Sequence, residues 1–238
     1  MPDDIPSIGM LVCDQITHPS MYFTEPSPYL KDTYYGRFAS YPKHRFKNED
    51  ELYITAISMI AGILRLDETG FTKNRDVTKR ITVSCRQASI LFSVILKAKG
   101  IPCRSRAGFM DFGDTGDSYL PRRKFVTASE AWIGLRKNTL NKKLDVFSPN
   151  PLEGVCEYLF MDFHALMNNE IFYSYQPLYL RGGIHTLNES ELHELDRLAE
   201  LLSEPDKNME QIENLWTTNE KFSVLTNNTQ NIYYDTFG

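Results

Sequence analysis

The sequence predicts an α+β fold that is rich in helices and has only a small, reduced antiparallel sheet. Apolar residues recur at helical spacing in several stretches, most clearly over residues 84–100 and 188–216. Three stretches open on a capping box, in which Thr or Asn is followed three residues later by Glu, at 48–51, 127–130 and 188–191. The alternation typical of a strand occurs in only two short segments, at 101–109 and 170–175.

Size and charge narrow the classes of function. A chain of 238 residues with 42% hydrophobic and 24% charged residues has ordinary globular composition and can bury a core. Its net charge of −5 argues against nucleic acid as a partner. No apolar run is long enough to cross a bilayer, and no basic segment followed by an apolar one opens the chain. We therefore expect no membrane partner and no signal peptide.

The four cysteines, at positions 13, 85, 103 and 156, stand singly in the sequence. None belongs to a CxxC pair or to a Cys/His cluster with the spacing of metal ligands, so we expect no metal site. No nucleotide-binding loop is visible either, and no cofactor is expected. Without a secretion signal, the expected location is cytoplasmic, where thiols stay reduced. At least one free cysteine therefore needs an explanation.

A helix is predicted from Ser84 to Gly100, with Cys85 in its first turn. Ser84 is a suitable N-cap, and Gly100 followed by Pro102 ends the helix. A thiol in the first turn faces backbone N–H groups and the positive end of the helix dipole, and Arg86 stands beside it. Both effects favour the thiolate, which is the nucleophilic form. The alternative is that Cys85 is a small buried side chain that packs as a hydrophobe.

After this helix, residues 101–109 are predicted to form a strand that has Arg104 and Arg106 on one face. Two such arginines are either solvated or form a pocket for an anion or a carboxylate. We therefore take Arg86, Arg104 and Arg106 as candidate binding residues.

The remaining elements are predicted as one core, residues 1–187, and a helical extension, residues 188–238, that packs on it. The core would begin with an irregular, proline-interrupted arm over residues 1–47, whose Tyr and Phe side chains dock on the larger body. The other predicted elements are a helix near 49–66, a loop at 67–80, a loop at 111–123, a helix at 128–138, a helix at 152–168 and a strand at 170–175. A helical hairpin is predicted after residue 188.

From Cys85 through Phe109 the sequence resembles the transglutaminase-like superfamily. The features that carry the resemblance are a cysteine that opens a helix, the helix end Gly100-Ile101-Pro102-Cys103-Arg104, and a segment that ends in Gly108-Phe109. Weaker likenesses to bacterial transglutaminase-domain proteins continue at residues 125–132, 166–170 and 192–202. The resemblance implies a papain-like core in which Cys85 is the nucleophile and His and Asp stand on the strands that follow.

The sequence departs from this pattern where the His and Asp are expected. Glu130-Ala131-Trp132 is the nearest match to the histidine motif, but the Thr127–Glu130 capping box places Trp132 on a helix. We therefore expect the two strands to be absent, with the loop at 111–123 in their place, and the Cys-His-Asp triad to be incomplete.

A substitute histidine would have to come within hydrogen-bond reach of Cys85. His193 is expected on the outer side of its helix. His18 and His44, in the aromatic arm, can fold toward Cys85, although nothing in the spacing requires it. His185, in a glycine-containing loop, is the preferred candidate.

Two classes of function follow. In the first, Cys85 attacks a carbonyl, forms a thioester and passes the acyl group to water or an amine; the substrate would be a peptide, an amine or a small-molecule acyl compound. In the second, the protein is a catalytically inactive scaffold that acts as a binding or regulatory module and recognises an anionic or peptide partner through Arg104, Arg106 and the aromatic arm. A third possibility is thiol chemistry that needs no histidine, such as carrying an acyl group or sensing an oxidant. The oligomeric state is not predicted.

Overall fold

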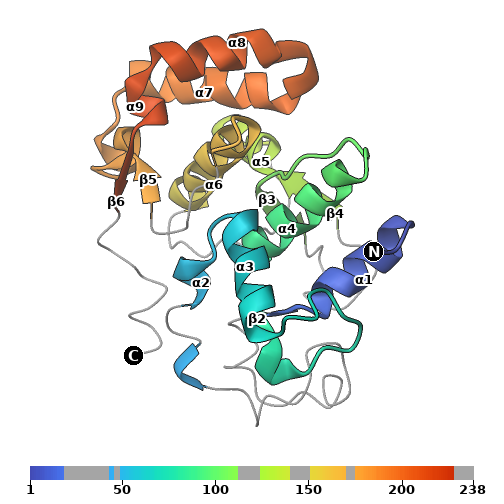
Figure 1. Cartoon of the computed structure of the whole chain (residues 1–238). Helices are drawn as coiled ribbons and strands as arrows, with labels where there is room; N and C mark the ends of the chain where they lie inside the picture. The colour runs from blue at the N-terminus through green and yellow to red at the C-terminus, as the bar shows by residue number, and fades with distance from the viewer. Residues whose placement is uncertain (19–42, 46–48, 112–123, 140–150, 170–174, 228–238) are drawn as a thin grey trace. The chain divides into compact units, whose positions relative to one another are not determined.

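The computed structural model of the chain is shown in Figure 1; it describes residues 1–18, 43–45, 49–111, 124–139, 151–169 and 175–227. The chain forms two compact units, Met1–Ser105 and Arg106–Gly238. In the described residues the fold is α+β: helices dominate, and the strands form three separate two-stranded pairs. None of the helices in these ranges is both long enough and apolar enough to span a membrane.

The first unit packs its helices around α4 (Cys85–Ala98). Both α1 (Ile5–Cys13) and α3 (Ala56–Leu66) contact α4. A parallel pair of very short strands, β1 (Ile16–Thr17) and β2 (Ile81–Thr82), lies in the same unit. The side chains that are completely buried in its core are Ile8, Met59, Ile63, Ile81, Val83 and Leu91.

Helix α1 corrects the prediction of an irregular arm at the start of the chain. Asp4 is its N-cap and accepts a hydrogen bond from the Ser7 N–H at 2.8 Å. Pro6 lies in the first turn, where a missing N–H costs nothing, and Ile8 is buried. The proline therefore starts a helix here instead of breaking one. Residues 19–42, which hold most of the predicted aromatic arm, lie outside the described residues.

The helix predicted near 49–66 is interrupted. The structure has α2 (Glu49–Leu52), a short non-helical link, and then α3. Thr55 begins α3 with a capping box, because its hydroxyl accepts the Ser58 N–H at 3.2 Å while the Ser58 hydroxyl accepts the Thr55 N–H at 3.1 Å. This cap requires an extended backbone at Thr55, which a continuous helix cannot supply.

Helix α4 has the predicted position and the predicted end. Gly100 has a φ of +75°, the left-handed conformation that ends a helix at low cost for glycine. The Ile101 N–H then donates to the Leu96 carbonyl at 3.0 Å. Ser84 occupies the N-cap position, but its side chain makes no capping hydrogen bond, contrary to the prediction.

The strand predicted over 101–109 is shorter and starts later. Only β3 (Gly108–Asp111) is a strand, paired antiparallel with β4 (Lys124–Thr127). The preceding residues find other partners: the Cys103 thiol donates to the Ser93 carbonyl at 3.3 Å, and the Ala107 N–H donates to Asp162 at 2.9 Å. The Cys103 thiol thus holds the segment against α4, and the Ala107 N–H, which is bonded to a side chain, is not available to a strand ladder.

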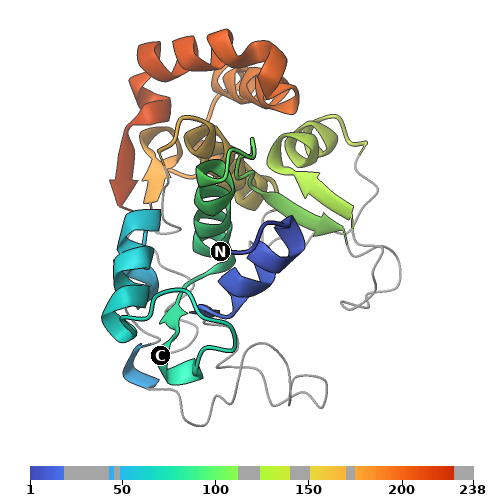
Figure 2. The same ribbon diagram turned by 45° about the vertical axis from the view of Figure 1, so that its right-hand side comes forward.

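The second unit is mostly helical, and two of its capping boxes are confirmed. Thr127 and Glu130 cap α5 (Ala128–Arg136), and Asn188 and Glu191 cap α7 (Glu189–Ser203). Helix α6 (Pro151–Leu166) agrees with the predicted 152–168. Figures 1 and 2 show α7 and α8 (Pro205–Thr218) side by side, as the predicted hairpin requires.

The core of this unit is aromatic. Trp132, Phe160, Phe163 and Phe222 have no exposed surface, and Phe222 belongs to the short helix α9 (Glu220–Ser223). After α9 the chain forms β6 (Leu225–Asn227), which pairs antiparallel with β5 (Tyr175–Pro177). Residues 170–174 of the predicted strand lie outside the described residues.

Candidate functional site

Cys85 is the one exposed cysteine of the four, all of which lie in the described residues. Cys13 and Cys103 are half-buried, and Cys156 is completely buried. The alternative in which Cys85 packs as a buried hydrophobe is therefore excluded. Partial or full exposure is what a reactive thiol needs, since a substrate has to reach the sulfur.

The first turn of α4 holds Cys85 in a fixed backbone. The Ala88 N–H donates to the Ser84 carbonyl at 3.1 Å, and the Ser89 hydroxyl donates to the Cys85 carbonyl at 3.0 Å. The Ser84 hydroxyl donates to the side-chain carbonyl of the buried Gln87 instead of capping the helix. No acidic side chain lies in this turn. The positive end of the helix dipole therefore acts on the turn that carries the thiol, without a carboxylate to offset it.

The first turn of α4 directly follows β2, the second strand of the parallel pair. Ile16 and Thr17 of β1 lie opposite Ile81 and Thr82 of β2. Hydrogen bonds of 3.1 Å, from the Ile81 N–H to the Gln15 carbonyl, and 3.0 Å, from the Val83 N–H to the Thr17 carbonyl, close the ladder. The next residue after β1 is His18, which lies opposite Val83 by the same register. Val83 is two residues before Cys85 in the sequence. Because these strands have two residues each, no alternation in the sequence shows them.

A buried arginine organises the loop between α3 and β2. The Arg75 side chain donates to the carbonyls of Ile63 and Gly70, both at 2.6 Å, and to that of Lys79 at 2.8 Å. It also donates to the Gln15 side chain at 3.0 Å, directly before β1. The guanidinium thus ties the loop to the first strand. The sequence pattern of residues 67–80 predicts a loop but gives no sign of this role for Arg75.

A largely buried ion pair, Arg45–Glu49, is bonded directly to β2. The Glu49 carboxylate accepts two hydrogen bonds from Arg45, at 2.6 and 2.8 Å, and one from the Thr82 N–H at 2.9 Å. Arg45 also donates to the carbonyls of Thr78 and Arg80. The strand that leads to Cys85 is therefore anchored by the Glu49 carboxylate, and the loop before it is anchored by Arg75.

The candidate arginines are in different environments. Arg86 is half-buried and follows Cys85 directly, whereas Arg104 is exposed and lies beyond the far end of α4. Because Cys103 bonds to Ser93, the segment with Arg104 runs back along α4. At 1.5 Å rise per residue, Ser93 is about 12 Å along the helix axis from Cys85.

Arg106 belongs to the second unit, where most of its donors are engaged. Its guanidinium donates to the Asp162 carboxylate at 2.7 to 3.0 Å and to the Leu202 carbonyl at 2.8 Å. The predicted pairing of Arg104 and Arg106 on one strand face does not form, because residues 101–107 are not a strand.

The other four histidines are in different environments. His164 is completely buried, with Nε2 2.9 Å from the Phe222 carbonyl and Nδ1 2.9 Å from the Asn169 side-chain amide. His193 is exposed and lies 3.5 Å from Asp196. The preferred candidate, His185, is exposed and belongs to the second unit. His44 is also exposed, in a single 3-10 turn of the first unit.

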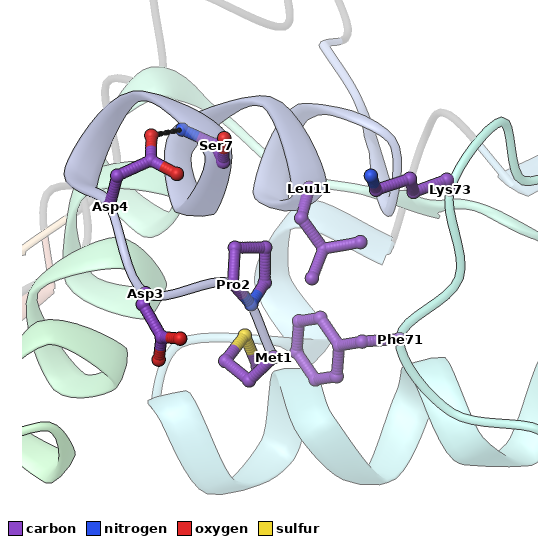
Figure 3. Close-up of a pocket in the computed structure, with 8 residues that line it drawn as sticks. All are labelled: Met1, Pro2, Asp3, Asp4, Ser7, Leu11, Phe71 and Lys73. Carbon is purple, nitrogen blue, oxygen red and sulfur yellow. Dashed lines mark hydrogen bonds between the residues drawn. The ribbon is translucent and has the colours of Figure 1, made fainter.

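A shallow hollow of about 550 Å³ lies elsewhere in the first unit (Figure 3). Asp3, Asp4 and Lys73 contribute charged groups to it, and Leu11 and Phe71 contribute apolar surface. Its lining includes neither Cys85 nor Arg86. Among the residues that the structure describes, no group of three or more metal-ligating side chains comes together.

Comparison with protein families, with curated proteins and with solved structures finds no match to this chain.

Proposed function

We propose that the protein is a transglutaminase-like acyltransferase or amidohydrolase in which Cys85 is the nucleophile. The exposure of Cys85 in the first turn of α4 carries this proposal. Of the four thiols, it is the one that is exposed, and therefore the one that an acyl compound reaches most easily. The resemblance at residues 85–109 supports the same role.

The chemistry proceeds in two steps. The sulfur of Cys85 attacks the acyl carbon, a C–S bond forms, and the C–N bond to the leaving amine breaks; the thiol proton ends on that amine. Water or a second amine then attacks the thioester and releases a carboxylic acid or a new amide, and the sulfur regains a proton. Each step transfers one acyl group, so no oxidant or reductant is needed.

Chain order also supports a papain-like arrangement. The nucleophile helix α4 is followed along the chain by the antiparallel pair β3–β4 and then by α5. Neither of these strands contains a histidine. The proposal therefore needs a base from another part of the chain.

The test uses p-nitrophenyl acetate as a small activated acyl donor. We expect a burst of p-nitrophenolate and the mass of one acetyl group on the peptide that contains Cys85, both abolished by Cys85→Ser. Cys103→Ser is the matched control, because that thiol is half-buried and bonded to Ser93; it should leave the burst unchanged. Acetylation spread over lysines, or equal in Cys85→Ser, contradicts the proposal and favours the inactive binding scaffold.

A further inference from the structure

We infer that His18 is the proton acceptor for Cys85, the base that the departure from the family pattern leaves unassigned. The inference rests on the proposed function of Cys85. It comes from the register of β1 and β2, which the sequence alone does not show.

The register brings the two residues to the same edge of the strand pair. Parallel strands end on the same side, so the residue after β1 and the helix that follows β2 emerge together. The Val83 N–H is bonded to the Thr17 carbonyl, which places His18 beside Val83. Cys85 is two residues beyond Val83. With strands about 4.8 Å apart and a rise of about 3.3 Å per residue at right angles to that spacing, the Cα atoms of His18 and Cys85 are about 8 Å apart. A histidine and a cysteine side chain can bridge that gap with a hydrogen bond.

The residues that precede His18 and Cys85 are held firmly in place. Thr17 and Val83 are completely buried. Gln15, immediately before β1, is bonded to Arg75, and Thr82 of β2 is bonded to Glu49. A base that has to meet a nucleophile within a few tenths of an ångström needs such support from the residues behind it.

The environment of His18 suits a base. Burial lowers the pKa of His18, so that its imidazole is neutral near pH 7 and able to take up a proton. The charged groups next to the two strands include Asp14 and Arg80, which face each other at 3.9 Å before the strands begin. They also include the Arg45–Glu49 pair, which is bonded to the Thr82 N–H, and Arg86 in α4. During acylation the proton moves from the sulfur to the imidazole, and then to the leaving amine as the C–N bond breaks.

The first experiment compares acetylation of Cys85 by p-nitrophenyl acetate in the wild type, His18→Ala and His44→Ala. Loss of a general base costs a factor of about 10² or more, so His18→Ala should acetylate at least about 10²-fold more slowly at pH 7. It should approach the wild-type rate at high pH, where hydroxide ionises the thiol. His44→Ala should match the wild type throughout. A wild-type rate in His18→Ala overturns this inference alone, whereas a wild type that never acetylates overturns the proposed function.

A second measurement leaves His18 in place and covers the case in which His18→Ala does not fold. The His18 ring is titrated by NMR in the wild type and in Cys85→Ala. A thiol that donates to the ring stabilises its neutral form, so removing the thiol should move the midpoint to higher pH. An unchanged midpoint shows that the two side chains do not interact and overturns the inference.

Discussion

Arg106 and Asp162 form a two-pronged ion pair in the second unit, with Nε 2.8 Å from Oδ1 and Nη2 2.7 Å from Oδ2. The carboxylate has no exposed surface and also accepts the Ala107 N–H. The same guanidinium donates to the Leu202 carbonyl in α7. One side chain thus joins the segment before β3 to α6 and α7, which gives Arg106 a structural role in addition to the binding role predicted for it.

Removing the carboxylate should be strongly destabilising. In Asp162→Ala the largely buried guanidinium and the Ala107 N–H lose their partner, and breaking such a pair costs about 3 to 5 kcal/mol. Urea unfolding of the two proteins measures this difference. Lys207→Ala is the control, because the Lys207–Glu204 pair is exposed on both sides and should cost at most about 1 kcal/mol. Losses of equal size would contradict a special role for Asp162.

Helix positions were predictable where the signal is local. The capping boxes at Thr127 and Asn188 and the glycine stop at Gly100 depend on residues within one or two turns, and all three are confirmed. The strand at 101–109 depended on alternation alone. The structure shows that Ala107 bonds to Asp162, 55 residues away, and no local pattern contains that contact.

For the candidate site, too, only the part that depends on local sequence could be predicted. The position of Cys85 in the first turn of α4 follows from its own helix pattern, and the structure confirms it. The nearness of His18 depends on two strands of two residues each, separated by more than sixty residues of chain. Strands this short carry no periodicity, so the sequence pattern could not predict that β1 pairs with β2 or that His18 lies close to Cys85.

Two helical glycines of the first unit should respond oppositely to alanine. A Cβ at Gly62 in α3 would collide with the ring of the buried Tyr53, so Gly62→Ala should destabilise by about 1 to 3 kcal/mol. A Cβ at Gly9 in α1 would meet Phe92 at an ordinary contact distance of 3.8 Å. Gly9→Ala should therefore stabilise by about 0.5 to 1 kcal/mol through helix propensity. Thermal unfolding of both variants checks the two signs; a stabilising Gly62→Ala would show that Tyr53 moves aside freely.

The four thiols should react with iodoacetamide in a fixed order. Cys85 should be labelled first because its side chain is exposed. Cys13 and Cys103 should follow more slowly, since burial and the neighbouring Asp14 raise the pKa of Cys13 and Cys103 is bonded to Ser93. Burial raises the pKa of Cys156 strongly, and that thiol should react only on unfolding.

Peptide mapping after timed quenching follows each cysteine separately. Labelling in urea is the control, because it should remove the order. Early labelling of Cys156 under native conditions would contradict the packing of the second unit.

Stability should fall as the pH is lowered through the range in which histidine titrates. Because burial lowers the pKa of His18, the unfolded chain takes up a proton at a higher pH than the folded protein does. The contribution of His18 is therefore complete above the ordinary histidine pKa of about 6.5, and it is lost as the pH falls through the folded value. A single such group gives a slope of at most about 1.4 kcal/mol per pH unit.

Urea unfolding from pH 8 to pH 5 should show this slope in the wild type and a smaller one in His18→Asn, while His44→Ala keeps the wild-type slope. Parallel profiles for the wild type and His18→Asn would mean that His18 is protonated as easily in the folded protein as in the unfolded chain, which would contradict the burial of its ring.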